Sequence, residues 1–207
     1  MLSNRDDLTS YITEIFIFRL KISELIKKLE EQVIDAMRLC CYKIDGTQHE
    51  AATVFEKLDP QAIKVVLAAQ DESRRQAHKS VDCEQLLLGF MADSQWLSSR
   101  VFESFGLKHQ EVRKLVNAKF GYGNEFVGVE TPFTDRLNGV LEASWRAAEQ
   151  AGKKSIGTKE LLIGFVLRAD GYAQEILSSA GVNLEKLCSE IARQESSEIS
   201  SPDISIT

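Results

Sequence analysis

The strongest constraint on the fold of this chain is an internal repeat. The sequence Leu-Leu-Leu-Gly-Phe at residues 86–90 returns 75 residues later as Leu-Leu-Ile-Gly-Phe at residues 161–165. Self-similarity at one fixed spacing is the sign of a duplicated structural unit. We therefore expect two copies of one fold, at residues 55–118 and 130–193. Three further blocks match in the same register: residues 65–66 with 140–141, residues 79–81 with 154–156, and residues 104–107 with 179–182.

Each copy has the pattern of four helices. The chain contains only three prolines, and long stretches without proline favour helix because an interior proline removes a hydrogen bond and clashes with the preceding turn. Pro60 suits the first turn of a helix, and Asp82 precedes the next apolar run as an N-cap residue does. Thr134 and Thr158 are the candidate N-caps of the second copy. The fold class that follows is all-α, with two pseudo-symmetric four-helix repeats.

Other residues mark the ends of the later helices. Gly106 and Gly181 lie where a glycine would end the third helix of each copy. Asn183 is a candidate N-cap for the fourth helix of the second copy. Residues 121–132 are glycine-rich and aperiodic, and we expect them to link the copies. The apolar residues expected in the fourth helix of the first copy are Val112, Leu115 and Val116.

Residues 1–52 differ from both copies and precede them. Their apolar residues recur every three and four positions, which predicts a long amphipathic helix with a stripe too wide for a strict two-stranded coiled coil. Such a helix must cover its apolar face by packing on the repeats, by pairing with a second copy of the chain, or by binding a partner. Residues 196–207 are polar and Ser-rich, and we expect a disordered tail there. The apolar residues expected at a partner or dimer interface are Ile15, Phe18, Ile22, Leu25 and Leu29.

The charge of the chain excludes several classes of partner. The net charge is −6 and the basic residues are spread among acids, so we expect no attraction to phosphate backbones and no nucleic-acid binding. The apolar run that ends before Arg19 is far too short for a membrane span, and no signal-peptide pattern is present. We therefore expect a cytoplasmic protein, or one of the plastid stroma if a transit peptide was removed from a longer precursor.

No residues stand at catalytic or metal-binding spacing. The cysteines form no Cys-x-x-Cys pair and no zinc-like cluster with histidine. His49, His78 and His109 are scattered, and the chain has no nucleophile elbow and no His-Glu-x-x-His motif. We expect a non-catalytic protein with no metal and no cofactor, and cysteines that are buried or half-buried thiols. The four cysteines are Cys40, Cys41, Cys83 and Cys188.

The repeated blocks resemble the N-terminal domain of Clp ATPases of the ClpC and ClpA type. In that family each repeat carries a pattern close to Phe-Thr-x-Arg-Ala, then Gly-Thr-Glu-His-Leu-Leu-Leu-Gly-Leu, and later Leu-Gly-Val. Here residues 133–137 read Phe-Thr-Asp-Arg-Leu, and residues 157–165 read Gly-Thr-Lys-Glu-Leu-Leu-Ile-Gly-Phe. Residues 82–90 read Asp-Cys-Glu-Gln-Leu-Leu-Leu-Gly-Phe. The resemblance covers residues 55–194 and implies a Clp N-domain-like fold for residues 53–195.

The resemblance also implies a function. The phosphate-binding Gly-x-x-x-x-Gly-Lys-Ser/Thr loop of a Clp ATPase is not found in the 207 residues, so we expect no ATP hydrolysis by that route. The chain is similar to stand-alone accessory proteins of the ClpT type in plastids and to ClpC-like bacterial proteins without ATPase modules. The expected role is a non-catalytic accessory or adaptor protein that binds a Clp ATPase, the Clp protease core or their substrates. The alternatives are a module that binds a ligand or modified peptide, acting as a decoy, and a structural homodimer formed by the N-terminal helix.

The ligand site implied by the resemblance is for phosphorylated arginine, which some ClpC proteins bind through the Thr of Phe-Thr and the Thr-Glu of Gly-Thr-Glu. A carboxylate pairs with the guanidinium, while hydroxyls and backbone N–H groups at a helix start bind the phosphate. In the first copy Asp59 would repel a phosphate, and in the second Lys159 would repel a guanidinium. The alternative role of Glu84, Thr134 and Thr158 is helix capping and first-turn charge. The matching residues are Asp59, Cys83 and Glu84 in the first copy, and Thr134, Thr158 and Lys159 in the second.

Overall fold

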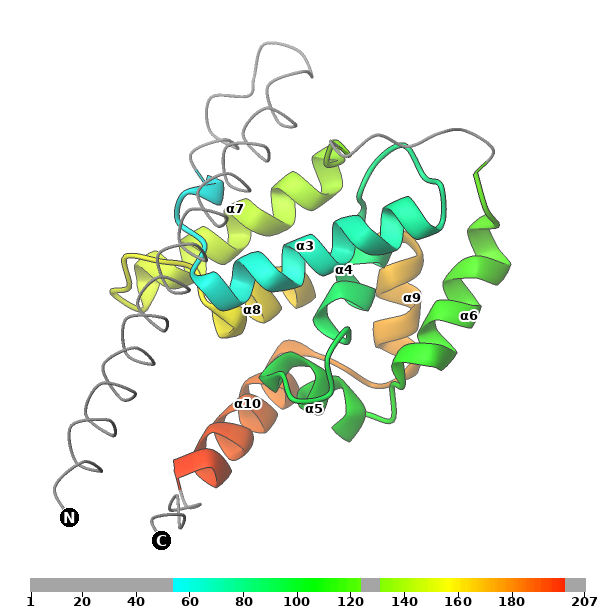
Figure 1. The fold of residues 1–207 in the computed structure, drawn as a ribbon. Coiled ribbons are helices and arrows are strands. Elements are labelled where there is room, and N and C mark those ends of the chain that lie inside the picture. The colour runs from blue at the N-terminus through cyan, green and yellow to red at the C-terminus, as the bar shows by residue number, and fades with distance from the viewer. Residues whose placement is uncertain (1–53, 124–130, 200–207) are drawn as a thin grey trace, which may run out of the picture.

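The first repeat consists of four helices in the computed structural model, which describes residues 54–123 and 131–199. These helices are α3 (Pro60–Arg75), α4 (Cys83–Phe90), α5 (Leu97–Ser104) and α6 (His109–Phe120). α4 packs along α3, and α6 lies at the edge of the molecule (Figure 1).

The second repeat has the same order of helices. They are α7 (Asp135–Gln150), α8 (Thr158–Arg168), α9 (Gly171–Ser179) and α10 (Leu184–Ile199). Over the described ranges, the regular elements are these eight helices, which confirms the predicted all-α fold of two four-helix repeats. α10 runs past the predicted start of the tail at residue 196, because the first residue there that breaks a helix is Pro202.

The two repeats exchange backbone contacts about a pseudo-twofold axis. Leu58 forms a parallel bridge with Ile156, and Phe133 forms the matching bridge with Val81. Leu58 and Phe133 are equivalent positions in the two repeats, and so are Val81 and Ile156. The segment before the first helix of each repeat is therefore paired with the segment before the second helix of the other repeat.

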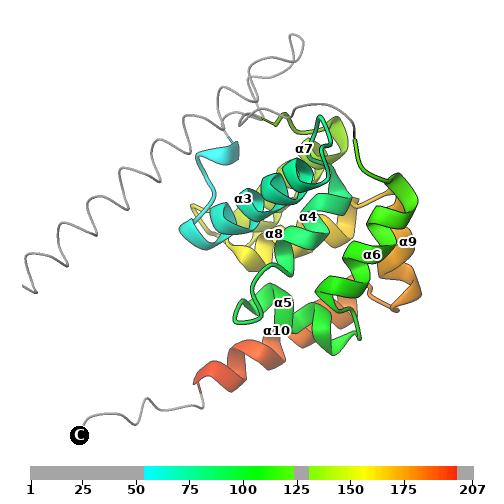
Figure 2. The ribbon, with the colours of Figure 1, turned by 45° about the vertical axis from the view of Figure 1, so that its right-hand side comes forward.

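The helices of the two repeats also interlock. α4 contacts α9 and α7 of the second repeat, and α8 contacts α5 and α3 of the first. α10 lies along α5 in both views (Figures 1 and 2). Aromatic rings from both repeats meet between them, since the centroid of Phe90 is 5.8 Å from that of Phe102 and 5.3 Å from that of Phe165. The repeats therefore share one hydrophobic core, and each covers apolar surface of the other.

The repeated glycines have equivalent surroundings. A Cβ on Gly89 would lie 2.9 Å from the amide nitrogen of Ala69, and a Cβ on Gly164 would lie 2.5 Å from the amide nitrogen of Ser144. Ala69 and Ser144 are themselves equivalent positions. Glycine lets α4 approach α3, and α8 approach α7, more closely than any side chain permits. The sequence duplication is thus a structural duplication.

Most of the predicted caps are confirmed. Asp82 accepts from the amide of Cys83 at 2.8 Å and caps α4, and Asn183 accepts from the amide of Lys186 at 2.9 Å and caps α10. Gly106 and Gly181 follow α5 and α9 with φ of 79° and 68°, the left-handed conformation that glycine adopts without strain. Their roles as terminators are therefore confirmed as well.

Residues 1–52 lie outside the described residues. The predicted amphipathic helix and its interface of Ile15, Phe18, Ile22, Leu25 and Leu29 therefore stay predictions. Within residues 54–123 and 131–199, no helix has the length and apolar character that crossing a bilayer requires.

Candidate functional site

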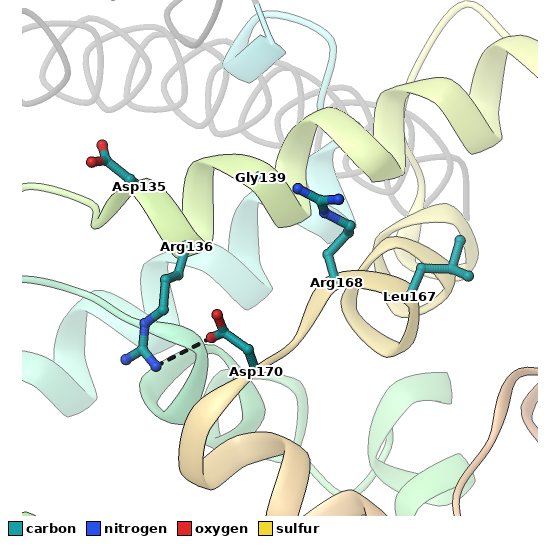
Figure 3. Close-up of a pocket in the computed structure, with 6 residues that line it drawn as sticks. All are labelled: Asp135, Arg136, Gly139, Leu167, Arg168 and Asp170. Carbon is teal, nitrogen blue, oxygen red and sulfur yellow. Dashed lines mark hydrogen bonds and ion pairs between the residues drawn. The ribbon is translucent and has the colours of Figure 1, made fainter.

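A surface cavity of about 390 Å³ lies between α7 and the end of α8, next to the residue that precedes α9 (Figure 3). Its walls carry two arginines and two aspartates, which makes it a polar hollow suited to charged rather than apolar groups. Arg136 stands at its border, with Nη1 3.2 Å from Oδ1 of Asp170 at the start of α9. The residues lining the cavity are Asp135, Arg136, Gly139, Leu167, Arg168 and Asp170.

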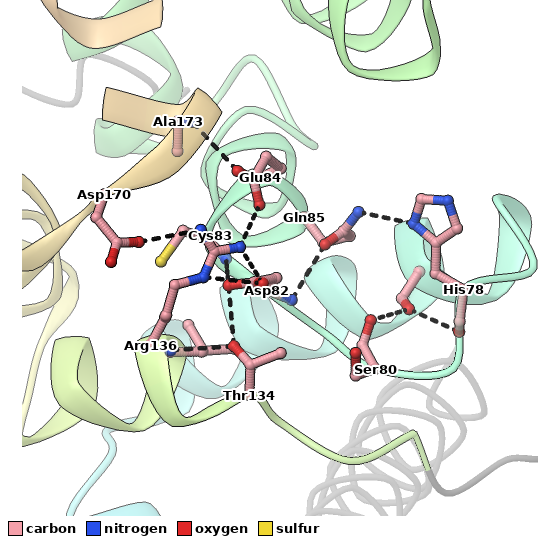
Figure 4. A network of polar contacts seen from close by, with 12 residues as sticks. His78, Ser80, Asp82, Cys83, Glu84, Gln85, Thr134, Arg136, Asp170 and Ala173 are labelled. Atoms are coloured by element: carbon pink, nitrogen blue, oxygen red, sulfur yellow. Dashed lines mark hydrogen bonds and ion pairs between the residues drawn. The ribbon is translucent and has the colours of Figure 1, made fainter. Parts of the chain in front are cut away.

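Arg136 reaches from the second repeat to the acidic start of α4 in the first (Figure 4). Its guanidinium Nε is 3.2 Å from Oδ2 of Asp82, and its Nη2 also contacts that carboxylate. Nη2 lies 3.5 Å from Oε2 of Glu84. The hydrogen bond with Asp82, followed by the charges of Asp82, Glu84 and Asp170, raises the pKa of Arg136 above its usual value. One arginine therefore serves three carboxylates from both repeats.

Glu84 is the most enclosed acid of this network. It is 2% exposed, and its Oε1 accepts from the amide of Ala173 at 3.3 Å, in the first turn of α9. Burial raises the pKa of Glu84, because a charged carboxylate loses hydration when it leaves water. Glu84 is therefore held by a guanidinium and by the positive end of a helix.

Thr134 and Cys83 lie in the same network. The hydroxyl of Thr134 is hydrogen-bonded there, and the thiol of Cys83 is buried. The hydroxyl of Thr134 donates to Oδ1 of Asp82 at 2.9 Å and accepts from the amide of Leu137 at 3.3 Å, so Thr134 caps α7 as predicted. Cys83 is buried, and burial together with the neighbouring acids raises the pKa of its thiol to about 12. A thiol with that pKa stays protonated at neutral pH, and Cys83 is a core residue.

The structure brings the candidate ligand residues together across the two copies rather than within each copy. The structure brings Thr134 of the second repeat to Asp82, Cys83 and Glu84 of the first, because the segments before α7 and α4 form one of the two bridges. The other bridge brings Asp59 beside Gly157, where a Cβ added to the glycine would lie 3.0 Å from Oδ2 of Asp59. Each site is thus built across the repeats, which a comparison within each copy could not reveal.

The second site of the pair differs in charge from the first. Lys159 occupies the position equivalent to Glu84, and its Nζ is 3.2 Å from Oε2 of Glu195 on α10. Glu160 follows it, is 2% exposed, and accepts from the amide of Gly157 at 3.1 Å and from Nζ of Lys153 at 2.8 Å. The carboxylate on α8 is therefore present one position later and is engaged in internal bonds.

Thr158 is not the N-cap of α8, contrary to the prediction from the sequence. The helix begins at Thr158, and Gly157 holds the cap position. Glu160 satisfies the amide of Gly157 from inside the helix, so the hydroxyl of Thr158 is not needed for capping. That hydroxyl is buried without a hydrogen-bond partner in the part of the chain that the structure describes.

The sequence did not predict Arg136 or Asp170 as site residues. Arg136 was visible as the arginine of the Phe-Thr-Asp-Arg stretch at residues 133–136, which is the one signal that could have found it. No sequence signal pointed to Asp170, because it precedes a helix of the second repeat and contacts the network only in the folded protein. Within the two described ranges, no three His, Cys, Asp or Glu side chains come together as metal ligands.

The family model of the Clp repeat (R) N-terminal domain matches residues 57–180 and, in a second alignment, residues 132–203. The chain is also similar to an ATP-dependent Clp protease ATP-binding subunit ClpA homolog of Guillardia theta, with 37% identity over 140 residues. That alignment covers 68% of this chain and 17% of the relative. The chaperone protein ClpC2, chloroplastic, of Oryza sativa subsp. japonica is 37% identical over 141 residues, which is 68% of this chain and 15% of the relative. The chain thus spans about a sixth of the length of these relatives.

Solved structures show the same fold. The ClpV N-domain in complex with a VipB peptide aligns with a TM-score of 0.57 at 20% identity, over 75% of this chain and 97% of that one. Both the family match and the 37% identity over two thirds of the chain agree with the interlocked four-helix repeats. The chain belongs to the Clp repeat (R) N-terminal domain family.

Proposed function

We propose that this chain is a non-catalytic accessory or adaptor protein of the Clp chaperone-protease system, which binds a Clp component or a Clp substrate through its helical repeats. The observation that carries the proposal is the 37% identity with a Clp protease ATP-binding subunit over 140 residues, together with the family match over residues 57–180. Binding of a partner peptide by the ClpV N-domain supports a binding role for this fold.

The side chains of the candidate site support binding rather than catalysis. Asp82 and Glu84 are engaged by Arg136, and Thr134 donates to Asp82. A general base or nucleophile needs a group that is free to meet a substrate. The compartment we propose is the cytoplasm, or the plastid stroma in line with the chloroplastic ClpC2 of rice.

Affinity purification tests this proposal. The full chain, carrying an affinity tag, is purified from a native lysate of its source, and the bound proteins are identified by mass spectrometry. We expect a Clp ATPase, a subunit of the Clp protease core, or both, enriched over a tagged all-α protein of similar size and charge. Absence of every Clp component at matched bait recovery would reject the role.

A second candidate function is recognition of a guanidinium on a modified peptide. It is favoured by one observation, the contact that Glu84 already makes with the guanidinium of Arg136. A ligand guanidinium has to displace Arg136 to reach Glu84. Calorimetry with phosphoarginine is therefore expected to give stronger binding to Arg136→Ala than to the unaltered chain, and none to Arg136→Ala/Glu84→Ala. Equal heats for the two variants would remove Glu84 from the site.

The N-terminal segment offers a separate test of the structural dimer. Light scattering measures the mass in solution of the full chain and of a chain shortened to begin at Thr53. A full-length mass of twice the monomer that falls to one monomer on shortening supports pairing through Ile15, Phe18, Ile22, Leu25 and Leu29. Monomeric masses for both chains would end that idea.

A further inference from the structure

The exposed side of α6 carries apolar residues that the fold does not use. Val112 and Val116 of α6 are buried, whereas Leu115 of the same helix is 46% exposed. Leu115 and Ala118 follow one another at helical spacing on the exposed side of α6, and Tyr122, which is 64% exposed, lies two residues beyond the end of the helix. We call these three residues the α6 stripe. A contiguous apolar stripe on a surface marks an interaction site more often than a scattered exposed residue does.

The second repeat provides an internal control for the α6 stripe. Val116 and Ile191 are equivalent and both are fully buried, which fixes the register between α6 and α10. In that register Leu115 corresponds to Glu190, and Ala118 corresponds to Arg193. The same fold therefore accepts charged residues at these positions, so packing within the repeat does not require the apolar residues of α6.

The exposed side chain of Tyr122 is hydrogen-bonded to α6. Its hydroxyl accepts from Nδ2 of Asn117 at 2.9 Å, and Oδ1 of Asn117 accepts from Nε2 of Gln76 at 2.9 Å. Gln76 also holds the chain after α6, because its carbonyl accepts from the amide of Gly123 at 2.8 Å. An aromatic ring that is ordered before a partner arrives loses little conformational entropy on binding. Exposed, ordered tyrosines are typical anchors of binding surfaces.

The charges beside the α6 stripe are basic. Lys114 and Lys119 are exposed and lie on opposite flanks of the stripe by helical periodicity. Lys114 forms no ion pair with any residue that the structure describes, and Nζ of Lys119 lies 5.2 Å from the ring centroid of Tyr172 on α9. The acid at the start of the stripe, Glu111, lies 3.9 Å from Nζ of Lys108. Two lysines are thus available to carboxylates of a partner, on a chain whose net charge is −6.

We infer that the α6 stripe binds an acidic amphipathic helix of a partner protein. The apolar face of that helix covers Leu115, Ala118 and Tyr122, and Asp or Glu residues on its two edges pair with Lys114 and Lys119. α6 lies beside α9 in both views and at the edge of the molecule in Figure 1, and Leu115, Ala118 and Tyr122 are exposed (Figures 1 and 2). This inference deepens the proposed function by naming a surface and the chemistry of its partner. Its test uses defined peptides and no Clp component, so the two can fail separately.

Fluorescence anisotropy with labelled peptides tests the inference on the full chain. The probe is a helical peptide of about 18 residues, five turns, with a leucine stripe edged by glutamates. The comparison peptides have lysine in place of glutamate, or the acidic composition in scrambled order. We expect the acidic amphipathic peptide to bind about tenfold more tightly than either, and to weaken as salt is raised.

Two variants locate the binding. Lys114→Glu/Lys119→Glu is expected to reduce affinity about tenfold or more, because two attractions become repulsions. The control Lys64→Glu/Lys154→Glu changes the net charge equally at exposed lysines of α3 and of the turn after α7, and should retain affinity within about twofold. Leu115→Gln should also weaken binding, because it replaces an exposed apolar side chain with a polar one of similar size.

Three results of the peptide-binding experiment would overturn the inference. The first is that the scrambled peptide binds as tightly as the acidic amphipathic peptide. The second is that Lys64→Glu/Lys154→Glu loses as much affinity as Lys114→Glu/Lys119→Glu. The third is that neither Leu115→Gln nor Lys114→Glu/Lys119→Glu changes the affinity. A light-scattering mass of a dimer that Leu115→Gln converts to monomer would show that a second copy of this chain covers the stripe, which also overturns it. Far-ultraviolet circular dichroism of each variant confirms that the helices are retained.

Discussion

The guanidinium of Arg136 lies 3.5 Å from the carboxylate of Glu84, and this contact joins the second repeat to the first. Glu84 is buried at the start of α4, whereas the side chain of Arg136 is 37% exposed. Removing the exposed partner would leave the buried charge without its cation. The contact therefore makes the docking of the two repeats sensitive to single substitutions on α7.

Arg136→Ala is expected to lower the free energy of unfolding by about 1–2 kcal/mol at neutral pH. A fully buried pair would cost more, but water screens part of the interaction at an arginine that is one third exposed. Urea unfolding followed by circular dichroism measures the change. Arg146→Ala on the same helix is the control, because Arg146 is 72% exposed and should cost less than about 0.5 kcal/mol. Equal effects of the two would show that the network adds no stability.

Glu84→Gln should change how stability depends on pH. Burial raises the pKa of Glu84, so the folded chain binds this proton more tightly than the unfolded chain. The contribution of Glu84 to stability is fully present below its ordinary pKa and is lost as pH rises through the raised value. Relative to the unaltered chain, Glu84→Gln should therefore gain stability as pH rises from the ordinary pKa of a glutamate through the raised pKa of Glu84. Unfolding in urea at a series of pH values measures the difference, and a constant difference would contradict the assignment.

Alanine at the two equivalent glycines should destabilise the fold to a similar extent. A methyl group on Gly89 would lie 2.5 Å from the carbonyl oxygen of Val65, and one on Gly164 would overlap Oγ of Ser144. We expect a loss of about 2–3 kcal/mol in each case from overpacking. Gly139→Ala on α7 is the matched control, since its methyl group would meet Arg168 at an ordinary 3.6 Å. It should stabilise by about 0.5–1 kcal/mol, because alanine favours helix over glycine.

A second buried acid, Glu72 on α3, should depend on Arg113 of α6. The side chain of Glu72 is 5% exposed, and its Oε2 accepts from Nε of Arg113 at 3.1 Å. Arg113→Met should destabilise by about 2–3 kcal/mol, because it leaves a buried carboxylate with weaker partners. Glu72→Gln/Arg113→Met should be more stable than the sum of the single losses predicts. Additive losses in thermal or urea unfolding would show that the pair does not act as a unit. Lys108→Ala, at an exposed pair, is the control.

The thiols of Cys83 and Cys188 should react at very different rates. Cys83 is buried with a pKa raised to about 12, whereas Cys188 is exposed. The expectation that the cysteines are buried or half-buried is therefore wrong for Cys188, which lies on the outer side of α10. Iodoacetamide labelling followed by peptide mass spectrometry should modify Cys188 in the native protein and Cys83 only in urea. Modification of both at one rate under native conditions would place Cys83 outside the core.

Predictions from local patterns were confirmed where the physical cause is local. A duplicated Leu-Leu-x-Gly-Phe block predicts a duplicated helix, because burial and helical period act within each block. Asp82, Thr134 and Asn183 cap the helices that follow them, since a cap needs only a side chain and an amide a few residues away at most. Thr158 is the exception. Glu160 satisfies the open amide instead, so two local solutions competed and the sequence did not decide between them.

The candidate site required the tertiary structure. Asp82 and Glu84 are far from Arg136 in the chain, and the bridge between Val81 and Phe133 places them beside it. Asp170 reaches Arg136 through packing within the second repeat. Nothing in the spacing of one copy signals a contact with the other, because that contact depends on apolar burial in the shared core and on ion pairs between the repeats. The sequence by itself therefore determined the helices, their caps and the duplication. The packing of one repeat against the other decided which residues share a site, and it left the α6 stripe exposed.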